Sequence, residues 1–213
     1  EMTAARFAAL ADAAIEDIAA RGRPVILAGG TGLYYRALVF GLFAGPPCDP
    51  ALRARLEEDA GRDGDAALWD RLRAVDHEAA ARIDSRDRLR VIRALEVWEL
   101  TGVPMSAHQR AHDHGLGNPR YEVLGVGINP SREELRARVE ARVQAMMAAG
   151  WVDEVRALLA AGYAPELRSL SAIGYRDIIR HLAGEVSLPA TTLRIIQATR
   201  RYARRQLAWF RSE

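Results

Sequence analysis

The sequence predicts an α/β fold, in which helices cover a parallel sheet, with an all-helical subdomain inserted into it. Two apolar runs, at residues 24–28 and 121–128, end in turns that contain glycine or proline and indicate buried strands. Helical patterns flank both runs, and such an alternation of helix and strand is typical of a parallel sheet. We therefore predict an α/β core over residues 1–47 and 119–213 and a helical subdomain over residues 48–118.

The first predicted strand leads into a Gly-Gly-Thr-Gly turn at residues 29–32. Helical spacing of apolar residues over 2–20 precedes the strand, and a helical pattern follows the turn. Glycines in such a turn let the backbone come close to a ligand or to another element. Thr31 lies just beyond the carboxyl end of the strand, the edge where open α/β sheets bind ligands. The alternative is that Thr31 only caps the next helix, and both roles are compatible.

The inserted subdomain carries only helical signals, beginning at Asp49, which caps a helix with Pro50 at its first position. The predicted helices cover residues 50–60, 64–75, 77–83 and 87–101. Near its end, His108, His112 and His114 raise the question of a metal site. They lack a carboxylate-rich frame, so we predict no metal site there.

A second group of helices follows the second predicted strand. Ser131 and Glu134 form a capping box that opens a helix reaching about Gly150. Arg138 and Arg142 lie off the apolar stripe of this helix. Such arginines bind phosphates bidentately or form a solvated face paired with glutamates, and the spacing alone favours the solvated face. A helix at residues 151–161 comes next, followed at residues 171–176 by a small turn and the start of another helix.

The last predicted helix, at about residues 189–211, carries the strongest basic signal in the chain. Its arginines share a broad face, and no acidic residue lies between residues 186 and 212. Arginines neutralise phosphates, while Gln206 and Trp209 supply groups that read or stack on unpaired bases. This pattern favours a face that binds RNA. The alternative is that Trp209 and Phe210 are core residues of a C-terminal helix.

Composition bounds these interpretations. The chain has 213 residues and a net charge of +2, and all 30 of its basic residues are arginine. GC-rich coding produces such arginine usage, so the count alone does not indicate nucleic-acid binding. Cys48 is the only cysteine, which excludes an internal disulfide and a cysteine-based zinc cluster. No apolar run approaches the length that crosses a membrane, so we expect no membrane partner.

Taken together, the motifs resemble those of the tRNA dimethylallyltransferases. Six motifs occur in the order found in that family and span nearly the whole chain: Gly29-Gly30-Thr31-Gly32-Leu33-Tyr34, Asp49-Pro50 with Arg53, Asp87-x-x-Arg90-x-x-Arg93-Ala94-Leu95-Glu96, Ser131-Arg132 leading to Arg138 and Arg142, Ile173-Gly174-Tyr175, and Thr199-Arg200 to Arg204-Arg205-Gln206-x-x-Trp209-Phe210. Each motif alone is weak evidence, but the ordered set is specific.

The resemblance implies a P-loop, nucleoside-kinase-like core and an inserted subdomain that helps to hold the tRNA anticodon stem-loop. It implies transfer of a dimethylallyl group from dimethylallyl diphosphate to N6 of the adenosine 3′ to the anticodon. By resemblance, Thr31 contacts the reacting nucleotide and is the only catalytic candidate, while Arg138 or Arg142 binds the diphosphate. The residues that the resemblance assigns to tRNA binding are Thr31, Arg53, Leu89, Arg90, Val91, Ile92, Arg93, Ser171, Ala172, Ile173, Gly174, Tyr175, Arg176, Arg204, Arg205, Gln206, Leu207, Ala208, Trp209, Phe210 and Arg211.

The sequence departs from the family pattern mainly at its start. The family begins with a Gly-x-x-x-x-Gly-Lys-Ser/Thr P-loop, through which Mg²⁺ is expected, followed by an aspartate base. These 213 residues contain no lysine and show neither feature, so we expect an N-terminal portion to be missing and this chain alone to be inactive. The loop at residues 85–88 also lacks the proline usual in the family. We expect a monomer located in the cytoplasm.

Two other functions stay open. One is a non-catalytic RNA-binding module. The other is an enzyme that transfers the dimethylallyl group to a free adenine nucleotide. RNA binding without product separates the module from the enzyme. The helical subdomain and the basic C-terminal face argue against a free nucleotide, since so small an acceptor needs no such surface.

Overall fold

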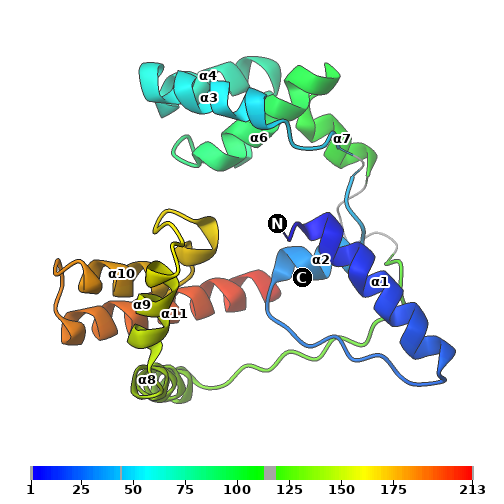
Figure 1. Ribbon diagram of the computed structural model, residues 1–213. Coiled ribbons are helices and arrows are strands. Elements are labelled where there is room, and N and C mark those ends of the chain that lie inside the picture. The colour runs from blue at the N-terminus through cyan, green and yellow to red at the C-terminus, as the bar shows by residue number, and fades with distance from the viewer. Residues whose placement is uncertain (1, 44, 113–118, 213) are drawn as a thin grey trace. The chain divides into compact units, whose positions relative to one another are not determined.

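The computed structural model describes residues 2–43, 45–112 and 119–212, and within these ranges the regular secondary structure is helical (Figure 1). The elements are α1 (Ala4–Ala20), α2 (Gly32–Val39), α3 (Pro50–Asp63), α4 (Asp65–Val75), α5 (His77–Arg82), α6 (Arg88–Thr101), α7 (Met105–Ala111), α8 (Arg132–Ala148), α9 (Trp151–Ala160), the 3₁₀ helix η1 (Arg168–Ser171), α10 (Tyr175–Leu182) and α11 (Leu188–Phe210). No described helix is both long and apolar enough to cross a membrane.

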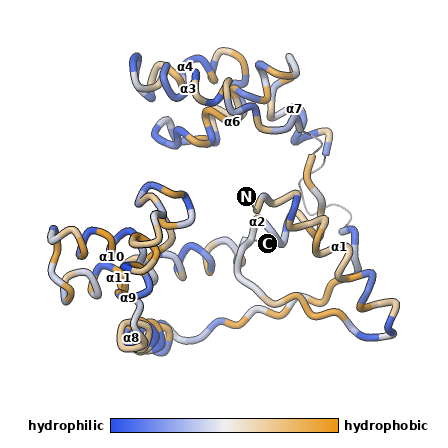
Figure 2. The backbone as a smooth tube through the Cα atoms, viewed as in Figure 1, coloured by the Kyte–Doolittle hydropathy of each residue, from blue (hydrophilic) through white to orange (hydrophobic). Residues whose placement is uncertain are grey.

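The predicted parallel sheet is wrong for the described residues, which contain no strand. The two apolar runs that indicated strands are extended but form no sheet ladder, and their side chains are exposed, with Ile26 at 87% and Leu124 at 91%. Figure 2 shows both runs as largely apolar, extended stretches of the tube. An apolar run records a tendency to be buried, whereas a strand exists only when a second strand accepts and donates its backbone hydrogen bonds.

The helices begin where their capping signals predicted. The Asp49 side chain accepts hydrogen bonds from the backbone N–H groups of Ala51 and Leu52 at the start of α3. The Ser131 hydroxyl accepts one from the backbone N–H of Glu134 at the start of α8, 3.1 Å away. These bonds satisfy donors that the first turn of a helix otherwise leaves unpaired, which is why local sequence fixes these boundaries well.

The chain divides into two compact units. Unit 1 comprises Glu1–Gly29 and Leu33–Val123, and unit 2 comprises Gly30–Gly32 and Leu124–Glu213. The predicted helical subdomain thus falls within unit 1, and its boundaries at 48 and 118 stay a prediction. The short segment Gly30–Gly32 belongs with the C-terminal helices, although both of its neighbours in sequence belong to unit 1.

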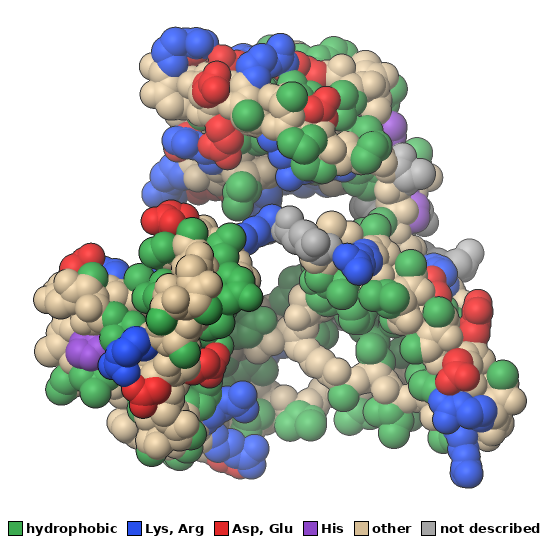
Figure 3. All heavy atoms as spheres, viewed as in Figure 1, with side chains coloured by type: hydrophobic (Ala, Val, Ile, Leu, Met, Phe, Trp, Pro, Cys, Tyr) green, Lys and Arg blue, Asp and Glu red, His purple; other side chains and the backbone are tan. Residues whose placement is uncertain are grey.

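Each unit has its own apolar core. In unit 1, helices α3 to α6 pack around Leu56, Leu72 and Val91, which are buried. Arginine and acidic side chains are interspersed over α3 and α4 on the face drawn in Figure 3. In unit 2, α8 to α11 pack around the buried residues Val155 and Ile195.

Gly174 provides a close contact in the core of unit 2. It has a φ of +99°, a conformation that favours glycine, and a methyl group built on it would overlap the Trp151 ring. The next residue, Tyr175, packs edge-on against that ring at 5.8 Å between centroids and donates a 2.6 Å hydrogen bond from its hydroxyl to Glu154. This hydrogen bond raises the pKa of Tyr175, because it is lost if the phenol ionises.

Candidate functional site

The Gly30–Gly32 segment is held against the C-terminal part of α11. The side-chain amide nitrogen of Gln206 donates a 2.6 Å hydrogen bond to the Gly30 carbonyl oxygen. A methyl group built on Gly30 would overlap that amide, and one built on Gly32 would overlap the Trp209 ring. The absence of side chains at both glycines is therefore what lets α11 approach the segment so closely.

Thr31, the catalytic candidate, lies between these two contacts. Its side chain is exposed, and its hydroxyl makes no hydrogen bond to another described residue. The capping role considered for Thr31 is therefore not seen in the described part of the chain. A hydroxyl that is exposed and held between two fixed neighbours suits contact with a ligand.

The basic face of α11 is formed by Arg201, Arg204 and Arg205, together with Arg211 at the C-cap of the helix, and all four are exposed. In residues 2–43, 45–112 and 119–212, no carboxylate forms an ion pair with any of these four arginines. Arg205 lies over the ring of Tyr202 at 5.9 Å from its centroid. Uncompensated positive charge on one helix face attracts polyanions, and its attraction weakens as salt is added.

Arg200, one turn earlier, differs from those four. It forms an ion pair with Glu140 of α8, and its side chain is mostly buried. Helices α8 and α11 pack together in unit 2. Arg200 therefore joins two helices, and the basic face of α11 begins beyond it.

The two diphosphate candidates lie on α8, in exposed positions. Arg138 forms a 2.6 Å ion pair with Glu134, one turn earlier on the same helix. This pair matches the solvated face that the spacing favoured, and an exposed i,i+4 pair contributes only about 0.3–0.5 kcal/mol to stability. Arg142 has no ion pair with a described residue, so no described carboxylate competes with a ligand for its guanidinium.

Within unit 1, Arg53 and Arg93 converge on Glu96 of α6, whose side chain is completely buried. Arg53 donates two hydrogen bonds of 2.9 Å to the carboxylate, Arg93 donates one of 2.5 Å, and the backbone N–H of Asp49 donates one of 2.8 Å. Arg93 also donates to the Pro46 carbonyl at 3.0 Å. We call these residues the Glu96 cluster; it fixes the start of α3 against α6.

The pKa of Glu96 reflects opposing causes. Burial is the largest effect and raises the pKa, because a charged carboxylate loses its hydration. The hydrogen bonds from Arg53 and Arg93, followed by that from the Asp49 N–H, together outweigh burial and leave the pKa below its ordinary value of 4.5. Glu96 is therefore ionised at neutral pH, and its charge neutralises part of the positive charge of the two arginines.

Of the other residues that the resemblance assigned to tRNA, some are exposed and others are buried. At the start of α6, Leu89 is 74% exposed and Arg90 is exposed, whereas Val91 is 1% exposed and Ile92 is also buried. Any ligand contact at this end of α6 therefore falls on Leu89 and Arg90. In unit 2, Ser171, Ala172 and Arg176 are exposed, while Gly174 and Tyr175 pack against Trp151. On α11, Phe210 and Ala208 are exposed, and Leu207 is half-buried.

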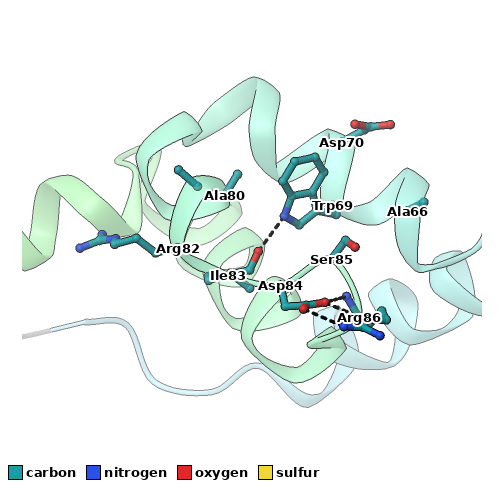
Figure 4. Close-up of a pocket in the computed structure, with 10 residues that line it drawn as sticks. Ala66, Trp69, Asp70, Ala80, Arg82, Ile83, Asp84, Ser85 and Arg86 are labelled. Atoms are coloured by element: carbon teal, nitrogen blue, oxygen red, sulfur yellow. Dashed lines mark hydrogen bonds and ion pairs between the residues drawn. The ribbon is translucent and has the colours of Figure 1, made fainter.

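A pocket of about 630 Å³ lies beside the loop at residues 84–86 in unit 1. Figure 4 shows the Trp69 indole pointing to the Ile83 carbonyl oxygen, to which it donates a 3.0 Å hydrogen bond. Hydrogen bonds from the Arg86 side chain and then from its backbone N–H lower the pKa of Asp84 to about 2. Asp70 and Arg82 instead pair with Arg73 and Glu78, which lie outside the pocket lining, and we assign the pocket no ligand.

The magnesium that the resemblance implied is expected through a P-loop, a motif that these 213 residues do not contain. Within the described ranges, no group of three or more His, Cys, Asp or Glu residues is placed to hold a metal ion. His108 instead stacks on Phe43 at 5.6 Å between ring centroids, and His114 lies outside the described residues. We therefore assign no chemical step to a metal ion held by these side chains.

The sequence does not identify the partners in two of these contacts. The Glu96 cluster joins residues 43 positions apart, and the Gln206–Gly30 hydrogen bond joins residues 176 positions apart. Glycines at 30 and 32 did indicate that something approaches the backbone closely. They gave no sign that the approaching element is the C-terminal helix.

The comparisons with known proteins agree with one another. The IPP transferase family model matches residues 1–213. A tRNA dimethylallyltransferase from Anaeromyxobacter dehalogenans is 50% identical over 212 residues, which are 100% of this chain and 70% of that protein. The crystal structure of a tRNA isopentenylpyrophosphate transferase from Bacillus halodurans is 35% identical with a TM-score of 0.64, covering 99% of this chain and 64% of the other.

A third comparison bears on the fold alone. A eukaryotic dimethylallyltransferase, whose structure is described as acting on tRNA, is 24% identical with a TM-score of 0.78, covering 98% of this chain and 52% of the other. The family model matches residues 1–213, and the alignment with the relative at 50% identity covers 212 residues, so both extend over the stretch that holds the motifs discussed above. The chain therefore belongs to the IPP transferase family, a family of prenyl-transferring enzymes whose curated relatives are tRNA dimethylallyltransferases.

Proposed function

We propose that this protein serves to transfer a dimethylallyl group from dimethylallyl diphosphate to N6 of the adenosine 3′ to the tRNA anticodon. The acceptor nitrogen forms a bond to the allylic carbon, the bond from that carbon to oxygen breaks, and diphosphate leaves with the electron pair. The amine proton passes to a base. This chemistry needs positive charge at the leaving group and a base near the amine.

The observation that carries the proposal is the basic face of α11. Four exposed arginines on one helix, with no ion-paired carboxylate among the described residues, match the charge of a nucleic-acid backbone. In this proposal Arg204, Arg205 and Arg211 contact phosphates of the anticodon stem-loop. Thr31 contacts the reacting nucleotide, and Arg138 or Arg142 contacts the diphosphate.

The Glu96 cluster has an indirect part in this proposal. It neutralises part of the charge of Arg53 and Arg93 with a buried carboxylate, and it anchors the start of α3 to the middle of α6, the helix whose exposed first turn carries Leu89 and Arg90. Leu89 and Arg90 are then the members of that segment that contact RNA. Arg53 and Arg93 contribute to RNA binding indirectly, through their ion pairs with Glu96.

The 213 residues on their own bind the stem-loop and transfer nothing. They contain no lysine, hence no phosphate-binding Gly-x-x-x-x-Gly-Lys motif, and the resemblance assigns no residue in them as the base. The Mg²⁺ expected from the resemblance remains a proposal on which no step depends. The monomeric state and the cytoplasmic location also stay predictions.

A direct experiment uses the 213-residue chain, a labelled anticodon stem-loop RNA and radiolabelled dimethylallyl diphosphate. We expect salt-dependent RNA binding and no transfer of label. Label transferred to RNA by this chain alone would contradict the inactive state. Failure to bind RNA at low salt would contradict the proposed tRNA acceptor, and binding of adenosine monophosphate in its place would favour the free nucleotide.

A further inference from the structure

The contacts between α11 and the Gly30–Gly32 segment suggest a role for two α11 residues that differs from RNA recognition. Gln206 and Trp209 lie three positions apart on α11, so their side chains project from one face of the helix. Gln206 hydrogen bonds to the carbonyl before Thr31, and Trp209 packs on the glycine after it. Both side chains are half-buried, in contrast to the exposed Arg204 and Arg205.

We propose that Gln206 and Trp209 are positioning residues, which hold the Gly30–Thr31–Gly32 segment so that the Thr31 hydroxyl faces the acceptor nucleotide. This inference rests on the function proposed above, in which Thr31 contacts that nucleotide. It replaces the direct RNA contact that the family resemblance implied for Gln206 and Trp209.

The geometry favours positioning over RNA reading for two reasons. The Gln206 amide already donates at 2.6 Å to a backbone carbonyl, so a base would have to compete for that donor. The Trp209 ring fills the place of a side chain at Gly32, so this part of the ring is not accessible for base stacking. A side chain at position 32 would also overlap the Trp209 ring, and one at position 30 would displace the Gln206 amide.

The consequence is a coupling between α11 and Thr31. Thr31 is exposed and follows Gly30, which lies outside any helix, while Gly32 begins α2. Glycine gives the backbone beside Thr31 added conformational freedom, and each restraint removes part of that freedom. Holding the hydroxyl in one place before the ligand arrives lowers the ordering cost of binding. Loss of either restraint should therefore remove the contribution of Thr31 to RNA affinity, while the phosphate contacts of Arg204 and Arg205 remain.

The test is a double-mutant cycle on RNA binding by the 213-residue chain, read as the Kd for the labelled anticodon stem-loop. Thr31→Val in the wild-type background should weaken binding about three- to tenfold, the loss of one hydrogen bond. In the Gln206→Leu background, Thr31→Val should change Kd less than about twofold. Gln197→Leu, an exposed glutamine of the same helix, is the matched control and should leave the effect of Thr31→Val unchanged.

A size exchange tests Trp209 independently. Gly32→Ala should weaken RNA binding, because the new methyl group overlaps the Trp209 ring. The pair Gly32→Ala with Trp209→Leu should bind RNA better than Gly32→Ala alone, because the smaller side chain makes room for the methyl group. Circular dichroism and the melting temperature identify variants that have lost their fold. If Gly32→Ala is one of them, the double variant Gly32→Ala/Trp209→Leu still provides the test.

The outcomes separate this inference from the function on which it rests. If the losses of RNA affinity for Thr31→Val and Gln206→Leu multiply, Gln206 contacts RNA itself. If the Gly32→Ala/Trp209→Leu pair binds RNA worse than both single variants, Trp209 contacts RNA itself. Either result overturns the positioning role, and the RNA-binding function would stand. Wild-type chain that binds no RNA overturns the proposed function, and the positioning role with it.

Discussion

The guanidinium of Arg53 donates two parallel 2.9 Å hydrogen bonds to the carboxylate of Glu96, which has no exposed side-chain surface. Such a two-point bond fixes distance and orientation together, which a lysine at position 53 would not do. With Arg93 and the Asp49 N–H on the same carboxylate, it anchors the segment that enters α3 to the middle of α6. Stability and surface geometry of unit 1 therefore depend on one buried charge.

Replacement of Glu96 by glutamine should destabilise unit 1. The amide removes the negative charge that compensates two guanidinium groups, and breaking such a pair costs about 2–3 kcal/mol where the arginines keep some access to water. Urea unfolding followed by circular dichroism measures the change. Glu99→Gln is the matched control on the same helix: Glu99 pairs with Arg55 and Arg71 closer to the surface, so less than about 1 kcal/mol should be lost.

The same carboxylate gives a defined pH dependence. Because the folded-state pKa of Glu96 lies below 4.5, its ionised form stabilises the fold, and this contribution is complete above the unfolded-state pKa. It should be lost as the pH falls from about 4.5 through the lower folded-state pKa. The difference in unfolding free energy between wild type and Glu96→Gln should therefore shrink in acid, and a difference that stays constant to pH 3 would contradict this origin.

Replacement of Gly174 by alanine should be costly in unit 2. The residue has a φ of +99°, and its new methyl group would overlap the Trp151 ring, so strain and overpacking add. Gly162→Ala is a matched control, with a φ of +86° and no neighbouring atom within 4 Å of the new methyl group. We expect a loss of about 1 kcal/mol for Gly162→Ala and of about 2–4 kcal/mol for Gly174→Ala, measured by thermal unfolding.

The helices were predictable from the sequence because their determinants are local. Asp49 with Pro50 and Ser131 with Glu134 fix helix starts through contacts within four residues. The sheet was not predictable in this way: the apolar run at residues 121–128 has the composition of a strand, yet it has no strand partner among the described residues. Strand pairing depends on a second segment, which no local pattern specifies.

In the candidate site, too, the features set by local sequence were predictable and the contacts between distant residues were not. The basic face of α11 was predictable, since it follows from arginine spacing along one helix and from the absence of acids beside them. The partners of Glu96 and of Gln206 were not, because those contacts cross 43 and 176 positions of sequence. Val91 and Ile92 illustrate a further limit: a motif marks a segment, and only packing shows which of its side chains are exposed.

RNA affinity as a function of salt tests the central claim most directly. Fluorescence anisotropy would give the Kd of the 213-residue chain for the anticodon stem-loop between about 50 and about 300 mM KCl. Arg204→Glu/Arg205→Glu should weaken binding at least tenfold and reduce the salt slope by about 1–2, because two phosphate contacts are lost. Arg21→Glu/Arg23→Glu, an equal charge change on exposed residues outside the proposed surface, should have little effect. Equal losses for both double variants, or none for Arg204→Glu/Arg205→Glu, would contradict the assignment of the α11 face to RNA.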